Sequence, residues 1–169
     1  MPAPVDPAAA AVAGLIAGQL MEVPAYLQRL LHRPLHQDVF AESGLLLGVY
    51  GRGQRLVGYL GHAGLSVIIA LAYAAFFRAV GAADQLLCWG LLAGLVHFTI
   101  GGLVVAAVFP AVDPSAVATQ TGGVGFAYAS YGQRDVLTFL GGHLLFGLLV
   151  GLLYPALHPA LPLGAALGA

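Results

Sequence analysis

Residues Leu86–Phe109 read LLCWGLLAGLVHFTIGGLVVAAVF and carry no formal charge. About 20 apolar residues in an α-helix match the roughly 30 Å hydrocarbon core of a lipid bilayer. Val57–Phe77 and Val136–Tyr154 are also uncharged and of similar length. A fourth apolar run, Ala8–Leu27, contains three interrupting residues, Gln19, Glu22 and Pro24. These four runs predict a protein that is embedded in a lipid bilayer.

The four runs predict an all-α, polytopic membrane protein, built as a four-helix transmembrane bundle with glycine-rich helix packing. One transmembrane domain is expected over residues 1–169, with helices at about 8–27, 56–77, 86–109 and 136–154 and long loops at 28–55 and 110–135. Pro24 is predicted to kink the first helix, and Pro110 and Pro155 to close the last two. Because no basic residue precedes the first run, we expect a membrane helix there and not a signal peptide.

The composition supports this class and excludes others. Of the 169 residues, 60% are hydrophobic and 8% are charged, against about 25% charged in a typical soluble domain. The net charge of −1 gives no basic surface for nucleic acid. Cys88 is the single cysteine, so no intramolecular disulfide can form. The basic residues are all Arg, which, with abundant Ala, Gly and Leu, indicates a bacterial protein of the inner (cytoplasmic) membrane.

The arginines also predict an orientation. Five of them fall in or beside the two long loops, and Arg78 alone falls in the short connection. Because cytoplasmic loops are rich in Arg and Lys, we expect cytoplasmic loops at 28–55 and 110–135 and both termini outside. Within the first loop, Val39–Tyr50 is apolar but too short to span, which favours a surface-lying or re-entrant helix.

Four ionisable residues lie within the predicted helices: Glu22, His62, His97 and His143. Each falls three, four or seven residues from glycines or other small residues, and therefore on the same helix face as them. Small residues mark the close-packed side of a membrane helix. We therefore expect all four side chains to point into the bundle.

Such a cluster has several possible roles. His62, His97, His143 and Glu22 could form the ligand set of a divalent transition metal. The three histidines could instead bind a cofactor, with two imidazoles as axial ligands of haem or one as the ligand of a chlorin pigment. An intramembrane carboxyl beside histidines could also relay protons or cations. Each histidine could simply hydrogen-bond a neighbouring helix.

No catalytic residue is predicted. The run Gly122–Gly125 is not followed by Lys-Ser/Thr, so it is not a phosphate-binding loop. The serines lack neighbouring His and Asp residues in the pattern that activates a nucleophile. The sequence therefore favours a protein that is not an enzyme.

Two segments resemble small four-helix bacterial integral membrane proteins of unknown function. They are Ala13–Met21, which resembles the first helix of those proteins, and Phe139–Gly147 with Gly151 and Tyr154, which resembles the last. The resemblance implies four helices and no activity, and it makes His143 the first residue to mutate. It does not extend to Glu22.

Three functions remain open at this point. The first is a non-enzymatic accessory or assembly subunit of a larger membrane complex, with other membrane subunits or further copies of the chain as partners. The second is a metal-, haem- or pigment-binding membrane protein. The third is a small transporter of protons, ions or solutes.

Overall fold

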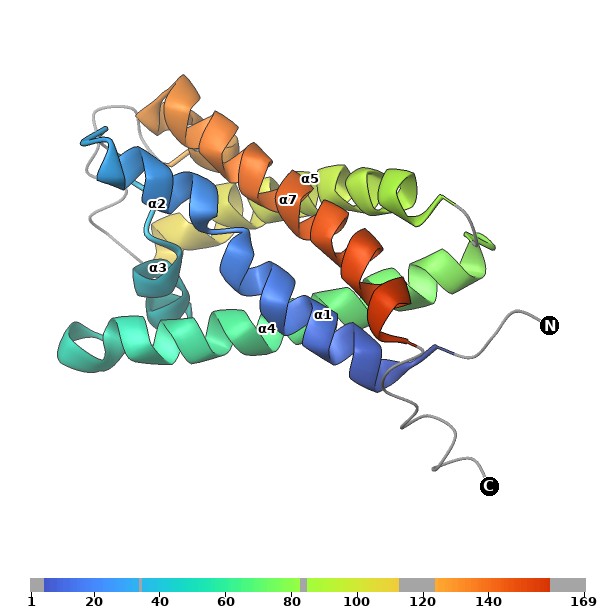
Figure 1. Cartoon of the computed structure of the whole chain (residues 1–169). Coiled ribbons are helices and arrows are strands. Elements are labelled where there is room, and N and C mark those ends of the chain that lie inside the picture. The colour runs from blue at the N-terminus through green and yellow to red at the C-terminus, as the bar shows by residue number, and fades with distance from the viewer. Residues whose placement is uncertain (1–4, 34, 83–84, 113–123, 159–169) are drawn as a thin grey trace.

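The computed structural model describes residues 5–33, 35–82, 85–112 and 124–158, and these residues form a bundle of helices (Figure 1). The α-helices are α1 (Pro7–Leu20), α2 (Val23–Leu30), α3 (Val39–Leu46), α4 (Gln54–Ala79), α5 (Leu86–Val112) and α7 (Gln133–Leu157). Two short 3₁₀ helices are η1 (Gly51–Gly53) and η2 (Phe126–Tyr131). No strand occurs in the described residues. The predicted all-α fold is confirmed.

Four segments are long and apolar enough to cross a membrane: Pro7–Leu30, Gly51–Ala79, Leu86–Ala111 and Gln133–Leu157. They correspond to the four predicted helices. A short helix, α3, is observed within the predicted segment Val39–Tyr50 and packs against α4, and its surface-lying or re-entrant position in a membrane stays a prediction. In the run Gly122–Gly125, the first two residues lie outside the described residues, because residues 113–123 are not described.

Prolines act differently in the three helices that contain them. The first predicted helix is two helices, because α1 ends at Leu20 and α2 restarts at Val23 with Pro24 in its first turn. Proline has no N–H to donate to the carbonyl four residues earlier, so the predicted kink is observed as a break. The prediction that Pro110 and Pro155 close their helices was wrong. Pro110 lies inside α5, which is described as far as Val112, and Pro155 lies inside α7, two residues before its last residue.

The arrangement of the helices leaves one side of the bundle open. Helix α7 packs against both α5 and α1, and α4 packs against α1 and α3. Helices α4 and α5 follow each other in the chain but share few contacts. Figure 1 shows α3 between α4 and the far end of α5. The bundle is therefore closed along α5–α7–α1–α4 and closed only in part between α4 and α5.

Glycine allows the close approach of the packed helices. A Cβ on Gly14 of α1 would lie 2.6 Å from the Ser66 carbonyl oxygen of α4. A Cβ on Gly94 of α5 would lie 2.7 Å from the His143 carbonyl oxygen of α7. Both distances are below ordinary van der Waals contact, so these positions hold their helices at backbone-to-backbone distance. The predicted glycine-rich packing is confirmed.

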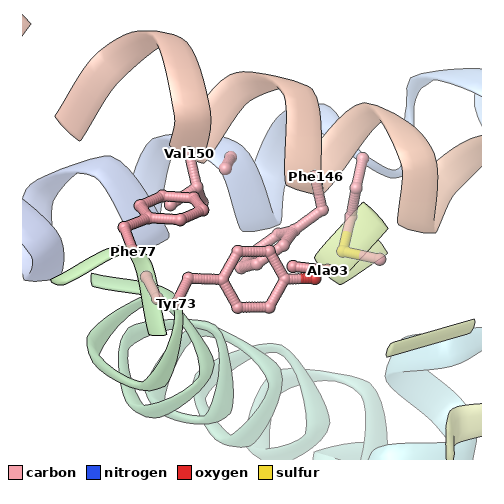
Figure 2. Packing of buried hydrophobic residues seen from close by; sticks show 8 residues of the cluster. Tyr73, Phe77, Ala93, Phe146 and Val150 are labelled. Atoms are coloured by element: carbon pink, nitrogen blue, oxygen red, sulfur yellow. The ribbon is translucent and has the colours of Figure 1, made fainter. Parts of the chain in front are cut away.

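An aromatic core fills the end of the bundle nearest the α4–α5 turn. Figure 2 shows Tyr73 and Phe77 of α4 packed with Phe146 and Val150 of α7 and with Ala93 of α5. The rings of Tyr73 and Phe146 meet edge to face, with centroids 5.6 Å apart. This core joins α4 and α5 at one end only.

A buried carboxylate fixes the opposite end. Asp135, in the first turn of α7, is 1% exposed. Its Oδ1 accepts the backbone N–H of His36 at 2.9 Å and that of Gln37 at 3.3 Å. The Gln37 side chain donates to the Asp135 carbonyl at 3.0 Å. The connection between α2 and α3 is thereby attached to α7, and α3 is held over the open side of the bundle.

Candidate functional site

A cavity of about 160 Å³ lies between the helices and is lined by residues from the break between α1 and α2, from α2 to α5, from η2 and from α7. Its lining includes all four residues predicted to point inward, Glu22, His62, His97 and His143. Six further polar residues line it: Gln37, Glu42, Ser43, Ser66, Tyr128 and Thr138. The rest of the lining is apolar. The four helices thus converge on one cavity that is rich in groups able to donate or accept hydrogen bonds.

Glu22 and His62 form the first pair of groups in this cavity. Glu22 lies at the break between α1 and α2, and its Oε1 is 4.0 Å from His62 Nε2 of α4. The same nitrogen lies 3.1 Å from the Gly18 carbonyl oxygen. A carbonyl can only accept, so Nε2 carries the hydrogen, and Nδ1 of a neutral ring has a free lone pair. The two side chains are 14% and 9% exposed.

His97 of α5 and His143 of α7 form the second pair. Their rings meet edge to face with centroids 4.5 Å apart. His143 Nδ1 donates to the Phe139 carbonyl at 2.8 Å, so in the neutral ring Nε2 is an acceptor. His97 Nδ1 is buried and has no hydrogen-bond partner among the described residues. The same is true of the hydroxyl of Tyr73, whose ring packs edge to face on His97 at 6.2 Å.

Two buried polar atoms without partners are unusual at one place in a fold. Each costs about 1 to 3 kcal/mol relative to a hydrogen-bonded group. Such groups in native proteins need an explanation, and a bound molecule that hydrogen-bonds to them is one. A ligand that hydrogen-bonds to His97 would remove part of this cost and so stabilise the protein.

A third pair, Glu42 and Tyr128, was missed by the sequence reasoning. The Tyr128 hydroxyl donates to Glu42 Oε2, and Glu42 Oε1 accepts the backbone N–H of Asp38 at 3.0 Å. Ala127 and Tyr128 both have positive φ, 49° and 66°, a region that costs a residue other than glycine about 1 kcal/mol or more. This strained backbone directs the Tyr128 ring inward. The only sequence signal was a carboxyl within the short apolar run Val39–Tyr50.

The environment of Glu42 makes it a pH-sensitive group. Burial raises the pKa of this carboxyl from 4.5 to about 7, although the hydrogen bond from Tyr128 acts in the opposite direction. Glu42 lies outside the four long apolar segments. Near neutral pH the folded protein therefore holds a carboxyl at the cavity that is protonated in a substantial fraction of molecules.

This pKa predicts how stability depends on pH. In the unfolded chain Glu42 ionises near pH 4.5, whereas the folded protein holds the proton to about pH 7. The contribution of Glu42 to stability is therefore full below pH 4.5, declines as the pH rises to 7, and is lost above it. The total decline is on the order of 3 kcal/mol. Glu42→Gln should remove this component, so thermal unfolding at pH 5 and pH 8 should differ less in the variant. Equal pH dependence in both proteins would contradict the assignment.

The cavity does not place the predicted metal ligands around one point. Among the residues that the structure describes, no group of three or more His, Cys, Asp or Glu side chains is positioned to hold a metal ion. The predicted set instead divides into Glu22–His62 and His97–His143. Metal binding by His62, His97, His143 and Glu22, and haem or chlorin binding by the three histidines, stay predictions.

Comparison with known proteins gives no match to a family model, a curated protein or a solved structure.

Proposed function

We propose that this chain is an integral membrane protein that binds a small molecule in the cavity between its helices. The observation that carries the proposal is that Glu22 and the three histidines, from four different segments, line one cavity, where His97 Nδ1 has no hydrogen-bond partner among the described residues. Intramembrane ionisable residues are costly and are by default functional. Polar groups converging on a largely apolar cavity are typical of a ligand site.

The proposal includes the membrane in which the protein lies and its orientation there. The four long apolar helices would cross a bacterial inner membrane, with the α3 end in the cytoplasm and both termini outside. The support is the distribution of arginines, because Arg29, Arg52 and Arg55 lie at the α3 end and Arg78 lies at the other. In a Cys88→Ala background, an impermeant maleimide added outside intact spheroplasts should label Arg78→Cys and not Arg52→Cys. The opposite pattern would reverse the orientation.

A comparison of His97→Leu with Thr99→Leu tests the binding function. Both residues lie on α5, but Thr99 is exposed, does not line the cavity, and donates its hydroxyl to the Leu95 carbonyl of its own helix. Protein purified from native membranes should retain a small molecule that mass spectrometry detects after denaturation. His97→Leu should retain about tenfold less, since one lost hydrogen bond is worth about 1 kcal/mol or slightly more. Thr99→Leu should retain the same amount as the unmodified chain.

The stability of the empty variant adds a second measurement. Replacing an unpartnered buried imidazole with an apolar side chain removes a desolvation cost. His97→Leu should therefore unfold at a temperature equal to or above that of the ligand-free parent, while it binds less. Equal retention of small molecules by His97→Leu and Thr99→Leu would overturn the proposed function. An absorbance spectrum of the same sample would reveal a haem or a pigment directly.

The accessory-subunit role and a transport role stay predictions. A stoichiometric companion protein after extraction in mild detergent would support the first, and flux in proteoliposomes abolished by Glu22→Gln would support the second.

A further inference from the structure

The cavity opens on the side of the bundle, between α4 and α5. Leu46, Leu65 and Val104 all line it, and they are 40%, 53% and 43% exposed on the outer surface. A side chain that both lines a cavity and is exposed outside it lies at the mouth. These three residues come from α3, α4 and α5, the helices that close the bundle only in part. The mouth is therefore lateral and apolar.

The height of this mouth decides what can enter. Leu65 lies eleven residues past Gln54, the first residue of α4, or about 16 Å along the helix. Val104 lies eight residues, or about 12 Å, before Val112, at which the described part of α5 ends. In a hydrocarbon core of roughly 30 Å, both positions face lipid tails and not water. A molecule that enters here comes from the lipid phase.

The volume of the cavity limits the size of the group that it can bind. A cavity of about 160 Å³ is close to the roughly 150 Å³ of an engineered cavity that holds benzene. There is room for one six-membered ring. The hydrogen-bonding groups lie on two walls, with Glu22–His62 between α1 and α4 and His97–His143 between α5 and α7. A ring with oxygen atoms at opposite edges can reach both walls.

We infer that the ligand is a lipid-soluble quinone or phenol, which enters between α4 and α5 and leaves its apolar tail in the membrane beside Leu65. This inference rests on the proposed function, because it names the class of molecule that the same cavity takes. The ring lies against the two histidine walls. One of its oxygen atoms supplies the hydrogen-bond partner that His97 Nδ1 does not have among the described residues.

The test uses three probes on the purified protein in lipid nanodiscs. They are a fully substituted benzoquinone with a decyl tail, tetramethylbenzoquinone without a tail, and decanol without a ring. Full substitution matters because the exposed Cys88 thiol adds to unsubstituted ring positions. At 100 times its dissociation constant, the tailed quinone should raise the Tm by about 5 to 10 °C. The two partial molecules should produce a much smaller shift.

Two variants of α4 distinguish entry through the mouth from general partitioning into the membrane. Leu65→Trp fills the mouth, whereas Ile68→Trp adds the same bulk at an exposed position, 63% accessible, that does not line the cavity. The shift caused by the tailed quinone should be lost in Leu65→Trp and kept in Ile68→Trp. His143→Leu, which changes the inner wall and not the mouth, should also lose the shift.

Each contrary result has a separate meaning. Equal shifts from the tailed and tail-less quinones, unchanged in Leu65→Trp, would overturn lateral entry. An equal shift from decanol would overturn recognition of the ring. If no probe shifts the parent protein, the quinone and phenol class is wrong, and the retention of small molecules by His97→Leu against Thr99→Leu still decides the proposed function independently.

Discussion

Gly147→Ala is expected to prevent normal folding or to destabilise the protein by at least about 3 kcal/mol, whereas Gly141→Ala on the same helix should stabilise it by up to about 1 kcal/mol. A Cβ on Gly147 would lie 3.0 Å from both the Gly90 carbonyl carbon and Gly94 Cα, and still closer to the Gly90 carbonyl oxygen. These are backbone atoms of α5 and cannot rotate away. A Cβ on Gly141 meets nothing within 4 Å. The only relief at Gly147 is a separation of α5 from α7.

The matched pair removes the usual ambiguity of glycine substitutions. Both changes reduce the entropy of the unfolded chain and raise helix propensity by a similar amount, about 1 kcal/mol in favour of alanine. Any difference between the two variants therefore reports the contact between α5 and α7. Thermal unfolding of the detergent-purified variants measures it. Equal Tm values for Gly147→Ala and Gly141→Ala would contradict backbone-to-backbone packing at this seam.

This seam also shows what the sequence could predict. In an apolar chain, helix positions follow from length and hydropathy, and glycines at spacings of three or four residues mark the faces that pack. Gly90 and Gly94 stand seven and three residues before His97, and Gly147 stands four residues after His143, so this spacing puts them on the inward faces. All three lie against backbone atoms of a neighbouring helix. Periodicity defines a face of a helix, but it does not say which neighbour that face meets.

The candidate site could also be predicted only in part from the sequence. That Glu22 and the three histidines face inward follows from their spacing to small residues. Their pairing as Glu22–His62 and His97–His143 does not, because it depends on the order of helices around the bundle and on the break before Pro24. Glu42 and Tyr128 were missed for another reason. Their contact joins residues far apart in the sequence, through a backbone with positive φ at Tyr128.

Asp135 is the residue outside the helix seams whose replacement should cost most. Asp135→Ala is expected to destabilise the protein by about 3 to 5 kcal/mol, because it leaves the backbone N–H groups of His36 and Gln37 without their acceptor. Asp135→Asn keeps one side-chain oxygen in the same place and should lose less, about 1 to 2 kcal/mol. The adjacent and exposed Arg134 provides the control, since Arg134→Ala should change the Tm little.

Asp135→Ala should also change the structure of the cavity. Gln37 lies next to α3 in sequence and lines the cavity, and its backbone N–H, with that of His36, donates to the Asp135 carboxylate of α7. Asp135→Ala removes these two bonds and leaves only the bond from the Gln37 side chain to the backbone carbonyl of residue 135, so α3, with Glu42 and Leu46, is held less firmly at the site. A cysteine at Leu46, in a Cys88→Ala background, should then react with a lipid-soluble maleimide several times faster in Asp135→Ala than in Arg134→Ala. If both variants react equally and also unfold at equal temperature, Asp135 does not secure α3, and α3 must be held by its other contacts, with α4, α5 and Tyr128.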